Sequence, residues 1–312
     1  MEAILNPALL LFLAGILVGI SLKLILPNSI SKYLGYYLLL SLGLKGGLSL
    51  QENGFINEVI SALTLGVLFA LLIPLIAYFY LKNLLNNDDA AALSGTYGSV
   101  SAVTFVTAIA YLSTTSQEFD NYMSAVLVVM EFPAIFMALY LVTRNKQNES
   151  NNLETIKTAF LEIPNIILIS SLLIGYFVNK AFLSNLDFII VEIFDYILYV
   201  FLFVMGTRVA KRIGELQGKG ANLIAFALCT PLIGSLIALI ASINFNISVG
   251  NATLLMVLTA SASYIAVPAV VKDAIPNANP AIYLGLSLGV TFPFNIIFGI
   301  PLYNELAKYF IG

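Results

Sequence analysis

Ten long apolar runs, separated by short polar segments, dominate the pattern of hydrophobic and polar positions along the chain. A helix needs about 20 apolar residues to cross the hydrocarbon core of a bilayer. The pattern therefore predicts an all-α membrane protein with ten spans, near residues 8–26, 33–50, 58–80, 90–112, 122–143, 160–180, 188–207, 221–243, 252–272 and 281–309. Gly43, Lys45, Gly46 and Gly47 interrupt the second run, which predicts a short or broken second helix.

The longest connection, residues 144–157, is rich in Asn and charge and is interpreted as a solvated linker. It divides the chain almost in half, which is a reason to look for an internal repeat. The halves match in outline, in the same order and at nearly one offset in sequence number. The matching pairs are Phe132-Pro133 with Phe292-Pro293, Gly98–Ser101 with Ala260–Ser263, and Lys45 with Arg208.

Five spans in each half is an odd number, so the second half must enter the membrane in the opposite sense to the first. We therefore predict two inverted five-helix repeats, residues 1–143 and 158–312, joined by the linker 144–157. Secondary transporters use inverted repeats to build one site that opens to either side of the membrane.

Composition removes other classes of protein. Of the 312 residues, 60% are hydrophobic and 10% are charged, whereas a soluble protein carries about 25% charged residues. The chain has no His and one Cys, Cys229. Ser-His-Asp chemistry, His-ligated metals and thiolate clusters are therefore excluded. No phosphate-binding loop and no basic tail are present. We expect neither an enzyme, nor an organic cofactor, nor a nucleic-acid partner.

Lysine and arginine in short loops set the orientation of a membrane protein, because they stay on the cytoplasmic side. If the loops alternate, one side receives Lys23, Lys32, Lys82, Arg144, Lys146, Lys157, Lys211, Arg212, Lys219 and Lys272. The other receives Lys180 and Lys308, with Lys45 and Arg208 at span ends. We predict a multi-pass protein of the inner (plasma) membrane, with the linker 144–157 in the cytoplasm and both termini outside.

Two predicted spans carry polar clusters, Ser94–Thr104 in the fourth and Thr259–Tyr264 in the ninth. A Gly-rich break in a membrane helix is tolerated only inside protein or beside water. Such a break presents free N–H groups, which attract an anion, and free carbonyls, which with hydroxyls suit Na⁺. The alternative is close helix packing by small residues, with hydroxyls bonded to their own helix. Two clusters at equivalent positions favour a binding site.

Glu131 is the acidic residue placed well inside an apolar run. Carboxylates in membranes are costly and usually functional, so a role near Na⁺, direct or through a neighbouring ligand, is one hypothesis. The other is a protonated or hydrogen-bonded carboxyl in a helix interface. Thr291 is its equivalent in the second half, and Asn295 lies one turn further on. Both are candidate polar partners. No Lys or Arg falls in the middle of the fourth, fifth, ninth or tenth span, so anion binding there would depend on Na⁺.

Four stretches, Leu42–Leu50, Tyr97–Leu112, Met130–Ile135 and especially Thr259–Tyr303, resemble the sodium-dependent bicarbonate transporter family known from cyanobacterial carbon concentration. The resemblance covers essentially the whole chain. It implies Na⁺ symport of bicarbonate, ten spans in two inverted repeats with crossed broken helices, and a homotrimer. It also implies a core subdomain that moves against a gate subdomain in an elevator-like scheme.

Carried over by position, the resemblance implies that hydroxyls and backbone at the two clusters bind bicarbonate and Na⁺. These positions are Gly98, Ser99, Ser101, Thr104, Thr259, Ser261 and Ser263. The Na⁺ site would be shared among Ser99, Ser101, Ser261 and Ser263. The linker is much shorter here than in the family, where a PII-like signalling protein docks on the cytoplasmic side, and this partner stays open.

Other functions remain to be distinguished. A symporter of another small anion on a similar fold is the nearest alternative. A Na⁺/H⁺ antiporter is less favoured, because neither 94–111 nor 253–271 contains a carboxylate. An ion-binding membrane sensor or scaffold would need an output domain, for which the loops leave no room. A channel would show flux without saturation.

Overall fold

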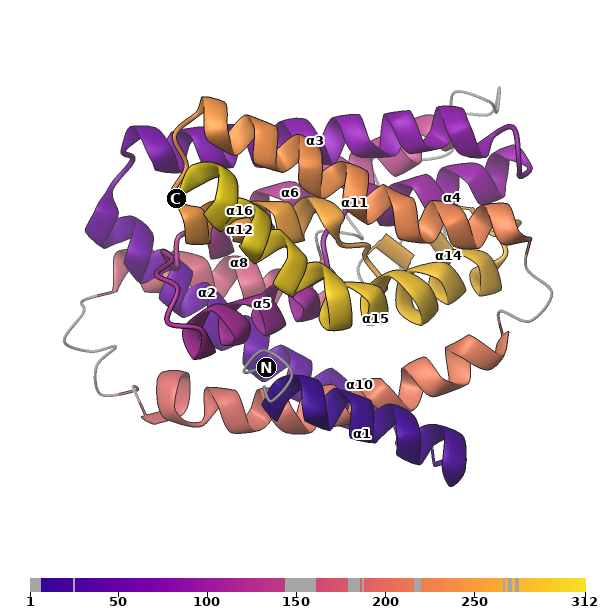
Figure 1. Ribbon diagram of the computed structural model, residues 1–312, viewed down its shortest axis with the longest axis horizontal. Helices are drawn as coiled ribbons and strands as arrows, with labels where there is room; N and C mark the ends of the chain where they lie inside the picture. Colours follow the sequence, from indigo (N-terminus) through magenta and orange to yellow (C-terminus); the bar gives the residue numbers. More distant parts are fainter. Residues whose placement is uncertain are drawn as a thin grey trace.

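The computed structural model describes residues 7–24, 26–143, 161–178, 186, 188–215, 220–265, 267–268, 271–272 and 275–312. The predicted linker 144–157 lies outside these ranges. All regular structure in the described part of the chain is helical (Figure 1). The elements are α1 (Pro7–Ser21), α2 (Asn28–Asn53), α3 (Asn57–Leu81), α4 (Asn87–Gly98), α5 (Ala102–Thr114), α6 (Met123–Thr143), α8 (Ile163–Phe177), η2 (Phe188–Glu192), α10 (Phe194–Glu215), α11 (Ala221–Asn244), α12 (Val249–Ala260), α14 (Pro280–Leu286), η3 (Ser287–Thr291), α15 (Phe292–Phe294), η4 (Asn295–Gly299) and α16 (Ile300–Ile311).

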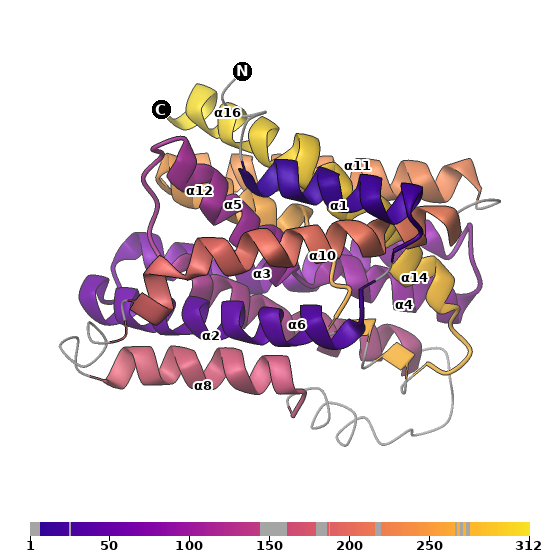
Figure 2. The same cartoon turned by 90° about the horizontal axis from the view of Figure 1, so that it is seen from below.

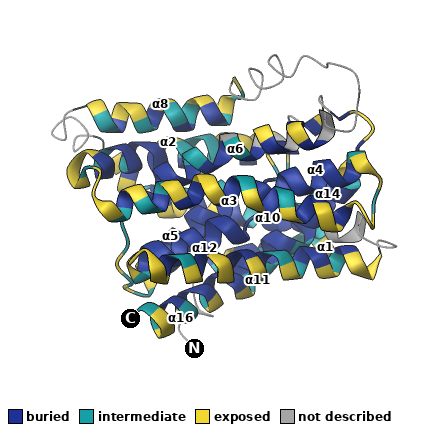
Figure 3. Cartoon of the chain, turned by 90° about the horizontal axis from the view of Figure 1, so that it is seen from above, coloured by how far each residue is buried: buried dark blue, intermediate teal, exposed yellow. Residues whose placement is uncertain are grey.

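Several of these helices are long and apolar enough to cross a membrane. Within the described ranges there are five such segments: Asn57–Leu81, Asn87–Thr114, Ile190–Arg212, Ala221–Asn244 and Pro280–Ile311. Three shorter apolar helices accompany them. The outer faces of α3 and α11 expose large apolar side chains such as Ile76 and Ile240, which are 60% and 61% exposed, and Figure 3 shows these exposed stripes beside a buried interior. A face of this kind suits lipid rather than water, so the chain is a membrane protein.

Helix α2 is continuous over 26 residues, so the prediction of a short or broken second helix is wrong. The glycines in it serve close packing instead. A Cβ on Gly47 would collide with the backbone of α8 at Leu172, and a Cβ on Gly175 of α8 would collide with the carbonyl of Leu44. Because these positions lack side chains, the two helix backbones approach each other along their length.

Helices α1 and α10 form a second close pair by the same device. A Cβ on Gly15 would meet the carbonyl of Phe203, and a Cβ on Gly206 would meet the carbonyl of Phe12. Figure 2 shows α1 running beside α10, and α2 beside α8. Each pair joins one helix from each half of the chain.

The other helices, α3 to α6 and α11 to α16, pack into a second group. Helix α4 stops at Gly98 and α5 begins at Ala102, which leaves a short break, residues 99–101, in the fourth predicted span. Helix α12 stops at Ala260 in the ninth. Gly98 lies against the ring of Pro74, which is inside α3, and leaves no space there for a Cβ.

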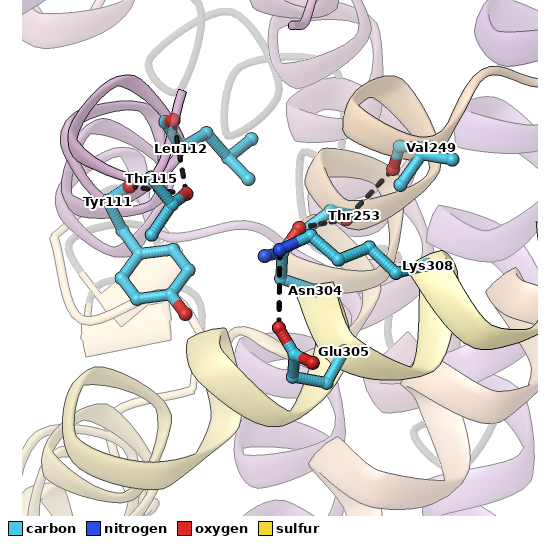
Figure 4. Close-up of polar contacts among 8 residues, drawn as sticks. All are labelled: Tyr111, Leu112, Thr115, Val249, Thr253, Asn304, Glu305 and Lys308. Atoms are coloured by element: carbon cyan, nitrogen blue, oxygen red, sulfur yellow. Dashed lines mark hydrogen bonds and ion pairs between the residues drawn. The ribbon is translucent and has the colours of Figure 1, made fainter. Parts of the chain in front are cut away.

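Polar contacts of similar form close the two ends of this group. At one end the backbone N–H of Asn279 donates to Oδ1 of Asp89 at 2.6 Å. At the other end the backbone N–H of Asp120 donates to Oδ1 of Asn251 at 2.8 Å. Further along α12, Thr253 Oγ1 donates to Asn304 Oδ1 of α16 at 3.4 Å, close to Tyr111 of α5 (Figure 4). These contacts hold the helices on both sides of the breaks.

Candidate ion-binding site at two crossed helix breaks

The first break comprises residues 99–101, whose backbone is extended between two helices. Ser99 has φ −93° and ψ 172°, and Ser101 has φ −109° and ψ 105°. The side chain of Ser101 caps α5, because its Oγ accepts from the backbone N–H of Thr104 at 3.2 Å. The hydroxyl of Thr104 also donates to Ser101 Oγ, at 2.9 Å. A well-formed helix N-terminus therefore begins here, inside the protein.

The second break includes residues 261–265, which are not helical, and it has a similar cap. Ser261 has φ −86° and ψ 166° and follows the last residue of α12. Ser263 Oγ accepts from the backbone N–H of Val267 at 3.3 Å, as Ser101 Oγ accepts from Thr104. Both serines thus act as caps for the residues that follow their break.

The two breaks are joined by hydrogen bonds, and together we call them the crossing. The backbone N–H of Ser101 donates to Ser261 Oγ at 2.9 Å. The backbone N–H of Ser263 donates to the carbonyl of Thr96 at 2.7 Å. The structure therefore brings the two polar clusters of the sequence into direct contact.

Glu131 of α6 reaches the first break. Its Oε2 accepts from Ser99 Oγ at 3.0 Å, its carboxylate also accepts from the backbone N–H of Val100, and the residue is 6% exposed. Neither broken helix has a carboxylate at its break, and the neighbouring helix α6 supplies one, Glu131. Glu131 lies on α6, outside the ranges 94–111 and 253–271, which contain no carboxylate of their own.

Asn295 has the corresponding position at the second break. Its Nδ2 donates to the carbonyl of Ala260 at 2.8 Å, and its Oδ1 accepts from the hydroxyl of Tyr303 at 2.8 Å. It is the first residue of the π-helical turn η4, and such turns occur often at functional sites. Asn295 is thus a partner of the second break rather than of Glu131.

Thr291, the last residue of the π-helical turn η3, bridges two other helices. Its Oγ1 donates to the carbonyl of Ala227 at 2.8 Å and lies 2.6 Å from the hydroxyl of Tyr97, which must then be the donor of that bond. Tyr97 and Tyr303 were not among the residues predicted for the site. Tyr97 directly precedes Gly98 and Tyr303 lies two turns after Asn295, but these positions do not distinguish them from the other tyrosines.

Two of the predicted ligand positions have other contacts in this conformation. The hydroxyl of Thr259 donates to the carbonyls of Leu255 and Met256 in its own helix, at 3.0 and 2.9 Å. Gly98 packs against Pro74. The remaining positions, which make up the hydrogen-bonded crossing itself, are Ser99, Ser101, Thr104, Ser261 and Ser263.

A cavity of about 50 Å³, the crossing cavity, lies between the crossing and the helices α2 and α8. The first turn of α5 lines one wall through Ser101, Ala102 and Val103, and Glu131 lines another. Ser263 and Tyr264 add polar groups, and α8 contributes the buried Asn165. Leu39 of α2 and Leu168 of α8 also line the cavity. A helix N-terminus presents N–H groups and a partial positive charge, whereas a carboxylate attracts a cation. The cavity therefore combines groups that attract an anion with a group that attracts a cation.

Comparison with known families assigns this chain. A model of the Na⁺-dependent bicarbonate transporter superfamily matches residues 7–308, which is nearly the whole length. A search of curated proteins gives no match. The chain belongs to the Na⁺-dependent bicarbonate transporter superfamily and is therefore a transporter and not an enzyme.

Proposed function

We propose that this member of the superfamily carries bicarbonate into the cell by symport with Na⁺, and that both ions bind at the crossing. The observation that carries the proposal is the crossing cavity, where the N-terminal turn of α5 and the carboxylate of Glu131 face the same space. An anion and a cation bound there would be only a few ångströms apart.

The geometry suggests how the two ions divide the site. Bicarbonate is a small monoanion with donor and acceptor atoms, so it suits the N–H groups at the start of α5 and the hydroxyls of Ser101 and Ser263. Na⁺ suits oxygen ligands, which Glu131 and Ser99 supply where they meet at 3.0 Å. Glu131 therefore belongs to the Na⁺ side of the proposed site.

Coupling follows from the shortage of fixed positive charge. The described residues that line the crossing cavity include no Lys or Arg. Two opposite unit charges about 4 Å apart interact by about 4 kcal/mol at an effective dielectric constant of about 20, and this corresponds to roughly a thousandfold in affinity. Bicarbonate without Na⁺ would lose most of that attraction, so it should bind and move only when Na⁺ is present.

Alternating access requires that the crossing open to either side, and the inverted repeat we propose provides it. Equivalent contacts in the two halves support the repeat. Ser101 and Ser263 are both caps, and they are equivalent when Gly98–Ser101 is aligned with Ala260–Ser263. The end contacts Asp89–Asn279 and Asn251–Asp120 have the same form. The same alignment pairs Asp89 with Asn251.

On this proposal the group α3–α6 with α11–α16 is the moving core, and α1, α2, α8 and α10 form the gate. The crossing cavity lies between the two groups, so sliding of the core along the gate in an elevator-like motion would carry the ions across. We place the protein in the inner membrane with ten spans, both termini outside and the linker 144–157 in the cytoplasm. The homotrimer and the PII-like partner stay predictions of the family resemblance.

The test is uptake of radiolabelled bicarbonate into proteoliposomes with an inward Na⁺ gradient, with an equal K⁺ gradient, and into protein-free liposomes that report diffusion of CO₂. We expect saturable uptake that requires Na⁺ and is accompanied by radiolabelled Na⁺ entry. Unlabelled formate, nitrate and acetate as competitors distinguish bicarbonate from another small anion. Absence of Na⁺-dependent bicarbonate uptake at every pH tested would refute the proposal.

The position of Glu131 favours Na⁺/H⁺ exchange as a second candidate, because a carboxylate at a helix break is what proton exchange needs. The two functions differ in one measurement. An exchanger acidifies or alkalinises the liposome lumen in response to a Na⁺ gradient without bicarbonate, which a trapped pH-sensitive dye reports. A bicarbonate symporter shows no such proton flux.

A further inference from the structure

A second, larger cavity adjoins the crossing cavity on one side. It has a volume of about 500 Å³ and four cationic lining residues, Lys32, Arg208, Lys211 and Arg212. Glu162 is the carboxylate among its described lining residues. We call it the basic vestibule. It shares Leu39, Pro164, Tyr264 and Ile265 with the crossing cavity, so an ion that leaves the crossing on this side enters it directly.

Arg208 is the cation of this vestibule that acts on the crossing. Lys32 and Lys211 are exposed, whereas Arg208 and Arg212 are half-buried, and of these two Arg208 is the one whose charge lies near Tyr264. Tyr264 follows Ser263 at the second break and lines both cavities. Its hydroxyl oxygen is buried near Ser101 but makes no hydrogen bond of good geometry with the described residues. The hydroxyl and the guanidinium therefore present donors on the route from the crossing to the vestibule.

The opposite side has a cavity of about 570 Å³, the acidic vestibule, whose described lining residues include Glu52, Asp120, Asp195 and Lys45. Lys45 Nζ lies 4.4 Å from the centroid of the Phe194 ring. This cavity shares no described lining residue with the crossing cavity. Among the described lining residues, the crossing cavity therefore adjoins the basic vestibule and not the acidic vestibule.

Lys45 and Arg208 are equivalent positions in the two halves of the sequence. Each is a half-buried cation on a gate helix, α2 or α10, and each lines one vestibule. In a transporter built from inverted repeats, the opposite conformation exchanges the roles of the two halves. Lys45 should then face the crossing when the acidic vestibule opens, as Arg208 does when the basic vestibule is open.

We propose that Arg208 and Lys45 are anion-guiding residues, each of which draws bicarbonate between its own vestibule and the crossing when that side is open. The inference rests on the proposed function, since it names bicarbonate as the anion. A cation in a wet vestibule raises the local anion concentration without holding the anion permanently. The crossing cavity has no fixed positive charge among its described lining residues, and on this proposal Arg208 and Lys45 on the neighbouring gate helices supply it.

The test measures the apparent KM for bicarbonate separately at each face, in intact cells for the outer face and in inside-out vesicles for the cytoplasmic face. By the positive-inside rule the basic vestibule faces the cytoplasm. Arg208→Gln should raise KM about threefold to tenfold in inside-out vesicles and leave KM in cells unchanged. Lys45→Gln should do the reverse, and Arg208→Lys should restore the wild-type value. Lys82→Gln, an exposed lysine that lines neither vestibule, is the control.

Ionic strength, raised with choline methanesulfonate at constant Na⁺, gives a readout that does not depend on a variant. Screening should raise the wild-type KM for bicarbonate at the cytoplasmic face. The KM values of the wild type and of Arg208→Gln should therefore become more similar at high ionic strength. The inference would be overturned if Arg208→Gln changed KM equally at both faces. It would also be overturned if the variant changed KM at neither face and the wild-type KM did not depend on salt. Both outcomes leave the proposed function intact. A wild type without Na⁺-dependent bicarbonate transport would instead refute the proposed function.

Discussion

The backbone N–H of Ser101 donates a 2.9 Å hydrogen bond to Oγ of Ser261, which lies in the other half of the chain. Ser261 Oγ in turn donates to the carbonyl of Leu258 in α12, at 2.8 Å. One hydroxyl therefore links the residue that caps α5 to the last turn of α12. A displacement of either helix end should therefore displace the other. Such a link would couple the binding of one ion to the binding of the second.

Ser261→Ala removes only one hydroxyl group, but we expect it to impair transport strongly. The substitution leaves the buried N–H of Ser101 without an acceptor, at a cost of about 1–3 kcal/mol. We expect kcat/KM for bicarbonate to fall about tenfold, with a weaker dependence on Na⁺, in the proteoliposome assay. Ser94→Ala is the matched control, because Ser94 is buried in α4 but donates only to the carbonyl of Ala91. Equal kinetics for the two variants would show that the link between the breaks is not needed.

Glu131→Gln should separate Na⁺ binding from bicarbonate binding. Glutamine keeps the shape and the bond to Ser99 but removes the charge, so the apparent KM for Na⁺ should rise at least about tenfold. Uptake of radiolabelled Na⁺ measures this directly. Glu305→Gln changes an exposed carboxylate on α16, 67% exposed and paired with Lys308, and should have no effect. An unchanged Na⁺ dependence would remove Glu131 from the site.

Gly98→Ala should destabilise the protein through packing alone. A Cβ at this position would overlap the ring of Pro74, so α3 and α4 must separate. Overpacking of this kind costs about 1–3 kcal/mol, which corresponds to a fall of about 2–10 °C in Tm. Gly220→Ala is the control, because nothing lies within 4 Å of a Cβ there. Heating in detergent followed by size-exclusion chromatography compares the variants, and equal melting would contradict the packing described.

Thr291→Val tests the bridge between Tyr97 and α11. Valine has the same shape as threonine but cannot accept from Tyr97 or donate to the carbonyl of Ala227. We expect a loss of about 1–3 kcal/mol in stability, seen as a lower Tm in the same heating assay. Thr114→Val removes an exposed hydroxyl that donates only to Ala110 in its own helix and should melt like the wild type. A Thr291→Val protein of wild-type Tm would show that the bridge contributes nothing.

Much of the fold could be predicted because apolar length and helix formation are coupled in a membrane. Each of the ten predicted runs contains a helix in the described structure, and breaks occur at Ser99–Ser101 and after Ala260, as the polar clusters suggested. The error in α2 had one cause. Gly43, Gly46 and Gly47 resemble helix breakers locally, whereas in the folded chain they allow close packing against neighbouring helices. A single sequence does not show which helix packs against a given glycine.

The candidate site was predictable in its serines and less so in its supports. Polar clusters at equivalent positions in the two halves favoured a binding site, and the family resemblance implied Ser99, Ser101, Ser261 and Ser263 within them. Glu131 stood out because a carboxylate in an apolar run is expensive. Tyr97 and Tyr303, by contrast, are among 16 tyrosines, and nothing in their neighbourhood separates a buried donor from an interfacial anchor. Only the packing of distant helices gives them their partners.

The glycine contacts between α1 and α10, and between α2 and α8, have a consequence for how such a chain is assembled. Among the described helices, α1 and α2 of the first half pack against α10 and α8 of the second half, as in a domain swap within one molecule. A half that is expressed alone would lack the helices against which its own α1 and α2, or α8 and α10, normally pack. Two separately expressed halves should therefore reassemble when they are made together.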